Sequence, residues 1–158
     1  MYSRDRKKKL KIAIDFLINS IEPKGGSRAF YSRLYHPLKG WSNMYPETTG
    51  YIIPTFINIG RTFKRQDTID KAMLMADWLL SIQNKDGSFI SGLYNKRAKK
   101  KSIFNSAQII IGLVNTYKFT NEEKYLNAAI NCGQWIVGSQ NKQNGMWDKY
   151  NYVDNFTP

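Results

Sequence analysis

The chain has 158 residues, which is enough for one domain with a hydrophobic core and too few for two comfortable ones. Its apolar fraction of 42% predicts a folded protein, and no run of about 18 apolar residues indicates a membrane span. A single cysteine and a single histidine exclude an internal disulfide and zinc sites built from several such residues. We therefore expect a cytoplasmic protein without a metal or a cofactor.

The net charge of +12 is concentrated in two lysine- and arginine-rich runs, 4–9 and 96–101. Such runs attract nucleic acid, anionic lipid or acidic polysaccharide, or they form a solvated surface. The chain has no RNP-type strand, no zinc finger and no basic region with heptads. We therefore expect no nucleic-acid partner, and the charge alone does not select another.

The first predicted element is an amphipathic helix over about 7–21. Leucine and isoleucine recur there at helical spacing, and the polar Asp15 and Asn19 interrupt the apolar stretch that a signal sequence would need.

Two later segments, about 48–89 and 105–147, repeat each other. An offset of 57 residues aligns Thr49 with Ser106, Trp78 with Trp135, and Gln83 with Gln140. One inserted residue then aligns Gly87 with Gly145. Matches at residues as rare as tryptophan indicate an internal repeat.

Each repeat unit predicts two antiparallel helices joined by a short link, which is an αα-hairpin. The first helix of each unit is nearly all apolar and the second is amphipathic, so the first should be buried. The expected ranges are about 49–63, 68–83, 105–118 and 122–139. The helix at 7–21 matches the second helix of a preceding hairpin, with Phe16 in the tryptophan position. The sequence thus predicts an all-α protein of about two and a half tandem hairpins.

Several local features refine this prediction. We expect a threonine hydroxyl, Thr48 or Thr49, to cap the helix at 49–63, and Asn121 to cap the helix at 122–139. Gly50 allows a neighbouring helix to approach closely. The glutamine of each "QNKDGSF"-type loop can bind the loop backbone, its glycine permits positive φ, and its aromatic residue folds back onto the helices. Trp78 and Trp135 should occupy equivalent, largely buried positions with structural roles.

The stretches "GWSNMYPETTGYIIPTF" and "FNSAQIIIGLVNTY", with hairpins that end in Q-x-x-D-G-S-aromatic, resemble the α/α-toroid proteins. These include six-hairpin glycosidases and the repeats of squalene and terpene cyclases. The chain looks most like the VpsJ-type proteins of bacterial exopolysaccharide clusters, which are often described as prenyltransferase or squalene-oxidase repeat proteins. No D-x-D-D motif occurs, which argues against terpene cyclisation.

The resemblance implies a single domain, 1–158, that is an incomplete toroid. A closed toroid needs about six hairpins, so we expect self-association or hairpins supplied by another chain. The end of the sequence, "YNYVDNFTP", resembles a loop that leads towards another helix. The resemblance also implies a role in bacterial polysaccharide synthesis or modification.

A site is expected where the long loops 22–48, 84–104 and 141–158 meet the N-termini of the apolar helices. Aromatic rings, cations and helix N-termini suit an acidic or lipid-diphosphate-linked saccharide. The candidate catalytic residues are Glu47, Asp86 and His36. The candidate substrate-binding residues are Arg28, Trp41, Tyr45, Tyr51, Asn105, Gln108 and Trp147.

Glu47 has more than one interpretation. At a helix N-terminus the dipole lowers the pKa of a carboxyl, which suits a base or a sugar ligand better than an acid. With Asp86 it could form the carboxylate pair of a glycosidase, and a lyase or epimerase remains open. The alternatives are a helix start without a functional role, and a non-catalytic module that binds an acidic glycan or a partner protein.

Overall fold

The computed structural model describes residues 4–38, 40–97 and 100–150, and this part of the chain is all-helical. It contains five helices: α1 (Arg4–Ser20), α2 (Pro46–Phe63), α3 (Gln66–Ile82), α4 (Ile103–Thr120) and α5 (Glu123–Gly138). The described loops contain isolated β-bridges and no strand. The prediction of an all-α fold is confirmed. None of the described helices is long and apolar enough to cross a membrane.

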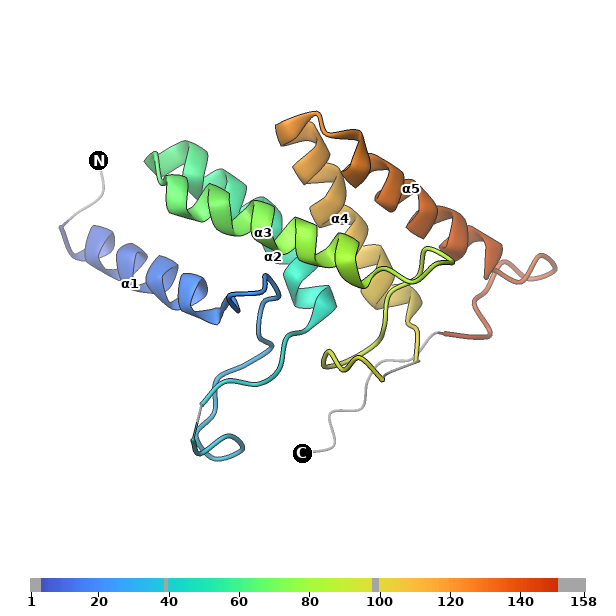
Figure 1. Ribbon diagram of the computed structural model, residues 1–158, viewed down its shortest axis with the longest axis horizontal. Helices are drawn as coiled ribbons and strands as arrows, with labels where there is room; N and C mark the ends of the chain where they lie inside the picture. The colour runs from blue at the N-terminus through green and yellow to red at the C-terminus, as the bar shows by residue number, and fades with distance from the viewer. Residues whose placement is uncertain (1–3, 39, 98–99, 151–158) are drawn as a thin grey trace.

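Helices α2 and α3 form one antiparallel hairpin, and α4 and α5 form a second (Figure 1). The two hairpins pack side by side through α2 and α4, which are their first and most apolar helices. Helices α1 and α5 lie at opposite ends of the array (Figure 1). The order is therefore the predicted one: one helix, followed by two hairpins.

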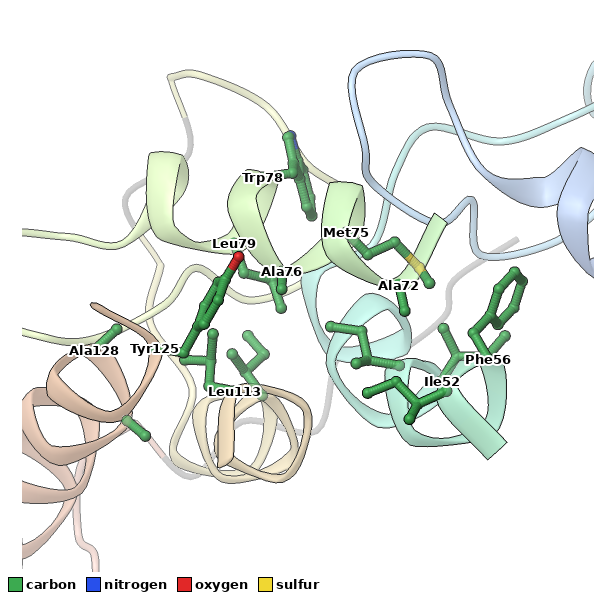
Figure 2. Close-up of a cluster of buried hydrophobic side chains, with 14 of the residues drawn as sticks. Ile52, Phe56, Ala72, Met75, Ala76, Trp78, Leu79, Leu113, Tyr125 and Ala128 are labelled. Carbon is green, nitrogen blue, oxygen red and sulfur yellow. The ribbon is translucent and has the colours of Figure 1, made fainter. Parts of the chain in front are cut away.

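The core lies between the two hairpins and beneath α3 (Figure 2). Ile52 and Phe56 of α2 meet Ala72 and Met75 of α3, because the apolar stripes of both helices face each other. Further along, Leu79 of α3, Leu113 of α4 and Tyr125 of α5 continue the same cluster. The Tyr125 hydroxyl donates to Asp77 Oδ1 at 2.8 Å, so α5 is also tied to α3 by a polar contact.

Two glycines allow α2 and α4 to cross with their backbones nearly in contact. A Cβ placed on Gly50 would lie 2.5 Å from Ile109 Cα, and one placed on Gly112 would lie 2.3 Å from the Gly50 carbonyl oxygen. No side chain fits in that space. The predicted close approach at Gly50 is confirmed, and Gly112 is its counterpart on α4.

The loops after α3 and α5 share the predicted chemistry. Gln83 Nε2 donates to the Gly87 carbonyl at 3.0 Å, and Gln140 Nε2 donates to the Gly145 carbonyl at 2.6 Å. Both glycines have positive φ, 88° and 71°, a region that glycine enters without strain. The Gln83 amide also donates to the Ala128 carbonyl at 2.9 Å, so this loop is fixed to α5.

The loop after α1 has the same backbone frame. Gly25 N–H donates to the Glu22 carbonyl at 2.9 Å, as Gly87 N–H does to Asn84 at 2.9 Å, and Gly25 has a φ of 114°. We call the three loops, 21–27, 83–89 and 140–147, the glycine loops. Their common frame supports the prediction that α1 is the equivalent of α3 and α5.

Each of these three helices carries an aromatic ring that packs on a ring from a later loop. Phe16 of α1 lies 5.2 Å from Trp41, Trp78 of α3 lies 5.3 Å from Tyr94, and Trp135 of α5 lies 5.4 Å from Tyr150, measured between ring centroids. The Phe16–Trp41 pair supports the assignment of Phe16 to the tryptophan position.

Both tryptophans are largely buried, as predicted, and Trp78 is buried more completely than Trp135. Trp78 is 6% exposed, because Gly25 of the preceding glycine loop packs against its Cβ. Trp135 is partly exposed. The corresponding glycine of the next loop, Gly87, lies against Asn131 and Cys132 of α5 instead.

Two predicted helix caps are wrong. Helix α2 begins at Pro46, because proline is pre-organised for the first helical position, and no threonine side chain caps it. The Thr49 hydroxyl instead donates to the Tyr45 carbonyl at 2.8 Å and accepts from Ser27 N–H at 2.9 Å. Asn121 does not cap α5; it ends α4 with a left-handed φ of 60°, a role that asparagine tolerates.

Candidate functional site

The start of α2 forms the floor of a small concavity of about 240 Å³. Glu47 lies in the first turn of the helix, and Tyr51 lies one turn later on the same face. Tyr45 precedes the helix and Ala29 comes from the loop after α1. The lining residues are Ala29, Tyr45, Glu47, Thr48 and Tyr51. Three of the predicted site residues are therefore neighbours.

Tyr45 connects this concavity to the second hairpin. It is only 8% exposed, and its hydroxyl accepts from Asn105 Nδ2 of α4 at 3.4 Å. Asn105 is itself fixed because Ser102 Oγ donates to its Oδ1 at 3.0 Å. Asn105 of α4 therefore holds the Tyr45 hydroxyl in place. Gln108, the repeat equivalent of Tyr51, is half-buried one turn further along α4.

The long loops contact one another at this end of the array. Tyr94 N–H donates to the Met44 carbonyl at 2.6 Å, and Ile103 N–H donates to the Tyr150 carbonyl at 2.8 Å. These bonds join the loop before α2 to the loop before α4, and that loop to the segment after α5. Backbone hydrogen bonds thus hold the loop before α2, which borders the Glu47 concavity, to the loop before α4.

Arg28 and Trp41 belong to a second cluster, next to the end of α1. The Arg28 guanidinium donates to Glu22 Oε1 at 2.8 and 3.0 Å and to the Asn19 carbonyl at 2.9 Å. It also lies 5.7 Å from the centre of the Trp41 ring. Arg28 thereby fixes the loop to the C-terminal end of α1, where a cation is favourable.

Exposed aromatic rings surround Trp41 in this second cluster. Tyr31 lies edge-on to it at 5.1 Å, and the Phe16 ring is tilted against it at 5.2 Å. A concavity of about 510 Å³ lies between them, lined by Phe16, Asn19, Tyr31 and Trp41. The structure therefore places Tyr45 and Tyr51 at one concavity and Arg28 and Trp41 in a second cluster, rather than all of the predicted substrate-binding residues at one mouth.

Asp86 lies in a third place, within the glycine loop after α3. Its carboxylate pairs with Lys101 and accepts from Ser88 Oγ at 2.6 Å and from Ser88 N–H at 3.2 Å. Burial raises its pKa, but these hydrogen bonds outweigh that effect and hold the pKa below the usual value. This geometry gives Asp86 a structural role. Its pairing with Glu47 across the mouth stays a prediction.

We expect Asp86→Ala to lower the free energy of unfolding by about 1 kcal/mol at neutral pH, since its side chain is partly exposed and solvent weakens the pair. Because the pKa is depressed in the folded state, the contribution is present above the unfolded value of 3.8. It is lost as the pH falls through the folded pKa. Urea unfolding of parent and variant, repeated towards pH 3, should therefore show the two converging.

The matched control is Asp70→Ala, on the exposed face of α3, which should change stability by less than about 0.5 kcal/mol. An Asp86→Ala protein as stable as the parent at neutral pH would contradict the structural role and return Asp86 to the candidates for chemistry.

The remaining candidates lie apart from Glu47. His36 is in the loop between α1 and α2, and its ring lies 5.7 Å from Phe30. Trp147 folds back onto α5, where its indole N–H donates to the Ile136 carbonyl at 2.8 Å. This confirms the expected folding back of the loop aromatic and gives Trp147 a structural function.

Cys132 offers no nucleophile at neutral pH. It is fully buried, and burial raises the pKa of its thiol to about 12. Within residues 4–38, 40–97 and 100–150, no group of three or more His, Cys, Asp or Glu side chains could hold a metal ion.

Sequence reasoning missed Ala29 as part of the Glu47 concavity and Asn19 as part of the second cluster. Neither had a signal, because a small residue and a surface asparagine are common everywhere. Tyr51, which was predicted, did have a sequence signal, because Glu47 and Tyr51 are four residues apart on one helix.

Comparison with known proteins adds no assignment: no family model, no curated protein and no solved structure matches this chain.

Proposed function

We propose that this chain is a saccharide-binding helical-repeat protein that acts in bacterial polysaccharide synthesis or modification, as an arc of a VpsJ-type α/α-toroid. The observation that supports this most directly is the concavity at the start of α2, where Glu47 lies between Tyr45 and Tyr51. A carboxylate accepts hydrogen bonds from hydroxyl groups, and tyrosine offers an apolar ring face together with a hydroxyl. This is a combination that suits a sugar.

The net charge of +12 favours an acidic saccharide over a neutral one, because the field of the whole protein attracts anions. A lipid-diphosphate-linked saccharide has the same negative character. The aromatic concavity at Trp41 extends the surface on which several sugar units could bind.

The geometry favours binding over glycoside hydrolysis. Hydrolysis requires two carboxyl groups on either side of the bond, and Asp86 is held by Lys101 and Ser88 in its own loop. A catalytic version of the proposal would use Glu47 as a single base, as in a lyase or an epimerase.

We expect Glu47→Gln to weaken binding of an acidic oligosaccharide about tenfold, because a charge-assisted hydrogen bond becomes a neutral one of similar shape. Isothermal titration calorimetry against alginate and heparin oligosaccharides measures this, with neutral dextran oligosaccharides for comparison. Affinity for the acidic ligands should also fall as salt rises, because cations provide part of the attraction.

Asp86→Asn is the matched control and should bind like the parent protein. If turnover is detected, a base at Glu47 predicts that Glu47→Gln keeps binding and loses about 100-fold in rate. A parent protein that binds none of these saccharides, or a Glu47→Gln variant in which neither affinity nor turnover changes, would show that this concavity is not the binding site.

A further inference from the structure

Each of the first two glycine loops covers the next amphipathic helix at the same position. A Cβ on Gly25 would lie 2.5 Å from the Leu74 carbonyl oxygen of α3, and one on Gly87 would lie 2.3 Å from the Asn131 carbonyl oxygen of α5. Leu74 and Asn131 are equivalent in the 57-residue repeat. The chain therefore contains the same loop-on-helix contact twice, and in both a glycine lies directly against helix backbone.

The third glycine loop has the same frame with one inserted residue, and no helix of the described part of the chain lies on it. Gly145 has a φ of 71°, and Asn141 N–H donates to the Met146 carbonyl at 2.7 Å, as Asn84 N–H does to Ser88 at 3.0 Å. A Cβ on Gly145 would meet only Gln140 Nε2 of its own loop, at 3.9 Å. Gly25 and Gly87 each contact the backbone of a helix, whereas Gly145 contacts none of the described helices.

Helix α1 has the complementary feature, a helix face on which no glycine loop lies in the described part of the chain. An offset of 62 residues, which takes Gly25 to Gly87 and Phe16 to Trp78, places Ile12 at the position of Leu74. Ile12 is 59% exposed and Phe16 is 52% exposed. A concavity of about 470 Å³ opens over this face, lined by Lys9, Ile12, Ala13, Phe16 and Leu17. The surface that receives a glycine loop on α3 and α5 is uncovered on α1.

We infer that the glycine loop 140–147 of one molecule docks onto the Ile12–Phe16 face of α1 in a second copy of this chain. The two surfaces are at opposite ends of the array (Figure 1), so one molecule cannot bring its own surfaces together. The contact reproduces between molecules the one that the chain makes twice within itself. Because it joins two different surfaces, it is head-to-tail, and association can continue beyond two copies.

Two variants each remove one side of the contact while the molecule itself should remain folded. Gly145→Asn keeps a residue that tolerates positive φ and places a side chain where helix backbone must lie. Ile12→Glu puts a charge on an exposed residue of α1. Leu34→Glu, at a position that is 84% exposed and outside both surfaces, is the matched control. Circular dichroism should show the parent's helix content for all three.

Sedimentation velocity up to about 100 µM suits the test, because an interface at the small end of the range binds weakly. The parent and Leu34→Glu should rise above the single-chain mass of 18.3 kDa with concentration. Gly145→Asn alone and Ile12→Glu alone should stay at one chain. An equimolar mixture of the two should form a species of two chains that grows no further, since each variant retains the surface that the other has lost.

Three results would overturn the inference. These are a parent protein that stays monomeric throughout, a single variant that associates like the parent, and a mixture that stays at one chain. Loss of association in Ile12→Glu only, with Gly145→Asn associating like the parent, would indicate a symmetrical α1–α1 contact.

Discussion

Trp78→Ala is expected to lower the free energy of unfolding by about 3–5 kcal/mol, the range for a large aromatic side chain truncated in a core. Trp78 is 6% exposed, its ring packs edge-on against Tyr94 at 5.3 Å, and Gly25 rests on its Cβ. Its removal leaves a cavity bounded by two loops and a helix, which cannot all close over it. Urea unfolding followed by circular dichroism measures the loss.

Trp135→Ala is the matched comparison within the same chain. Trp135 is the repeat equivalent and has a similar aromatic neighbour, but it is half-buried. Since the cost follows the apolar area removed from water, we expect a smaller loss of about 1–2 kcal/mol. Equal losses at the two positions, or a Trp78→Ala protein that unfolds like the parent, would contradict the role of the glycine loop in burying Trp78.

Gly112→Ala is expected to lower the free energy of unfolding by about 2–3 kcal/mol, although alanine is the better helix former. The added Cβ would lie 2.3 Å from the Gly50 carbonyl oxygen, so α2 and α4 must separate. Separation loosens the contact between the two hairpins and the side chains of Ile53 and Ile109 around it, both fully buried. Urea unfolding again gives the difference.

Gly133→Ala, on α5, tests the same chemistry without the crossing. A Cβ on Gly133 would meet nothing within 4 Å, so the substitution should stabilise the protein by about 0.5–1 kcal/mol through helix propensity alone. If Gly112→Ala were also stabilising, the backbones of α2 and α4 could not be as close as the structure has them.

The helices and loops are largely predictable because their causes are local. The apolar periodicity places all five helices within a few residues, and the repeat places the glycine loops together with the folding back of Trp147. The two errors at helix ends also concern residues with local signals. Pro46 is typical of a first helical position, and Asn121 is a residue that commonly ends a helix in the left-handed region.

The candidate site is less predictable because its contacts join distant parts of the chain. Lys101 binds Asp86 across 15 residues, and Asn105 reaches Tyr45 across 60. Nothing in the sequence near Asp86 indicates its partner, so its grouping with Glu47 rests only on both being acids in long loops. Trp135 is less completely buried than Trp78 although the two are repeat equivalents, and a repeat alignment cannot reveal that difference.

The glycine loops also imply an order of unfolding. Each of the first two glycine loops is hydrogen-bonded to the hairpin that follows it. Ser27 N–H donates to Thr49 Oγ1 at 2.9 Å, and Phe89 N–H donates to Ser106 Oγ at 3.1 Å. Opening α5 therefore uncovers no later unit in the described part of the chain, whereas releasing the loop after α1 removes the cover from Trp78. Helix α1 packs on the other described helices far less than α5 packs on α4, so partial opening should cost least at the α1 end and should expose Trp78 early.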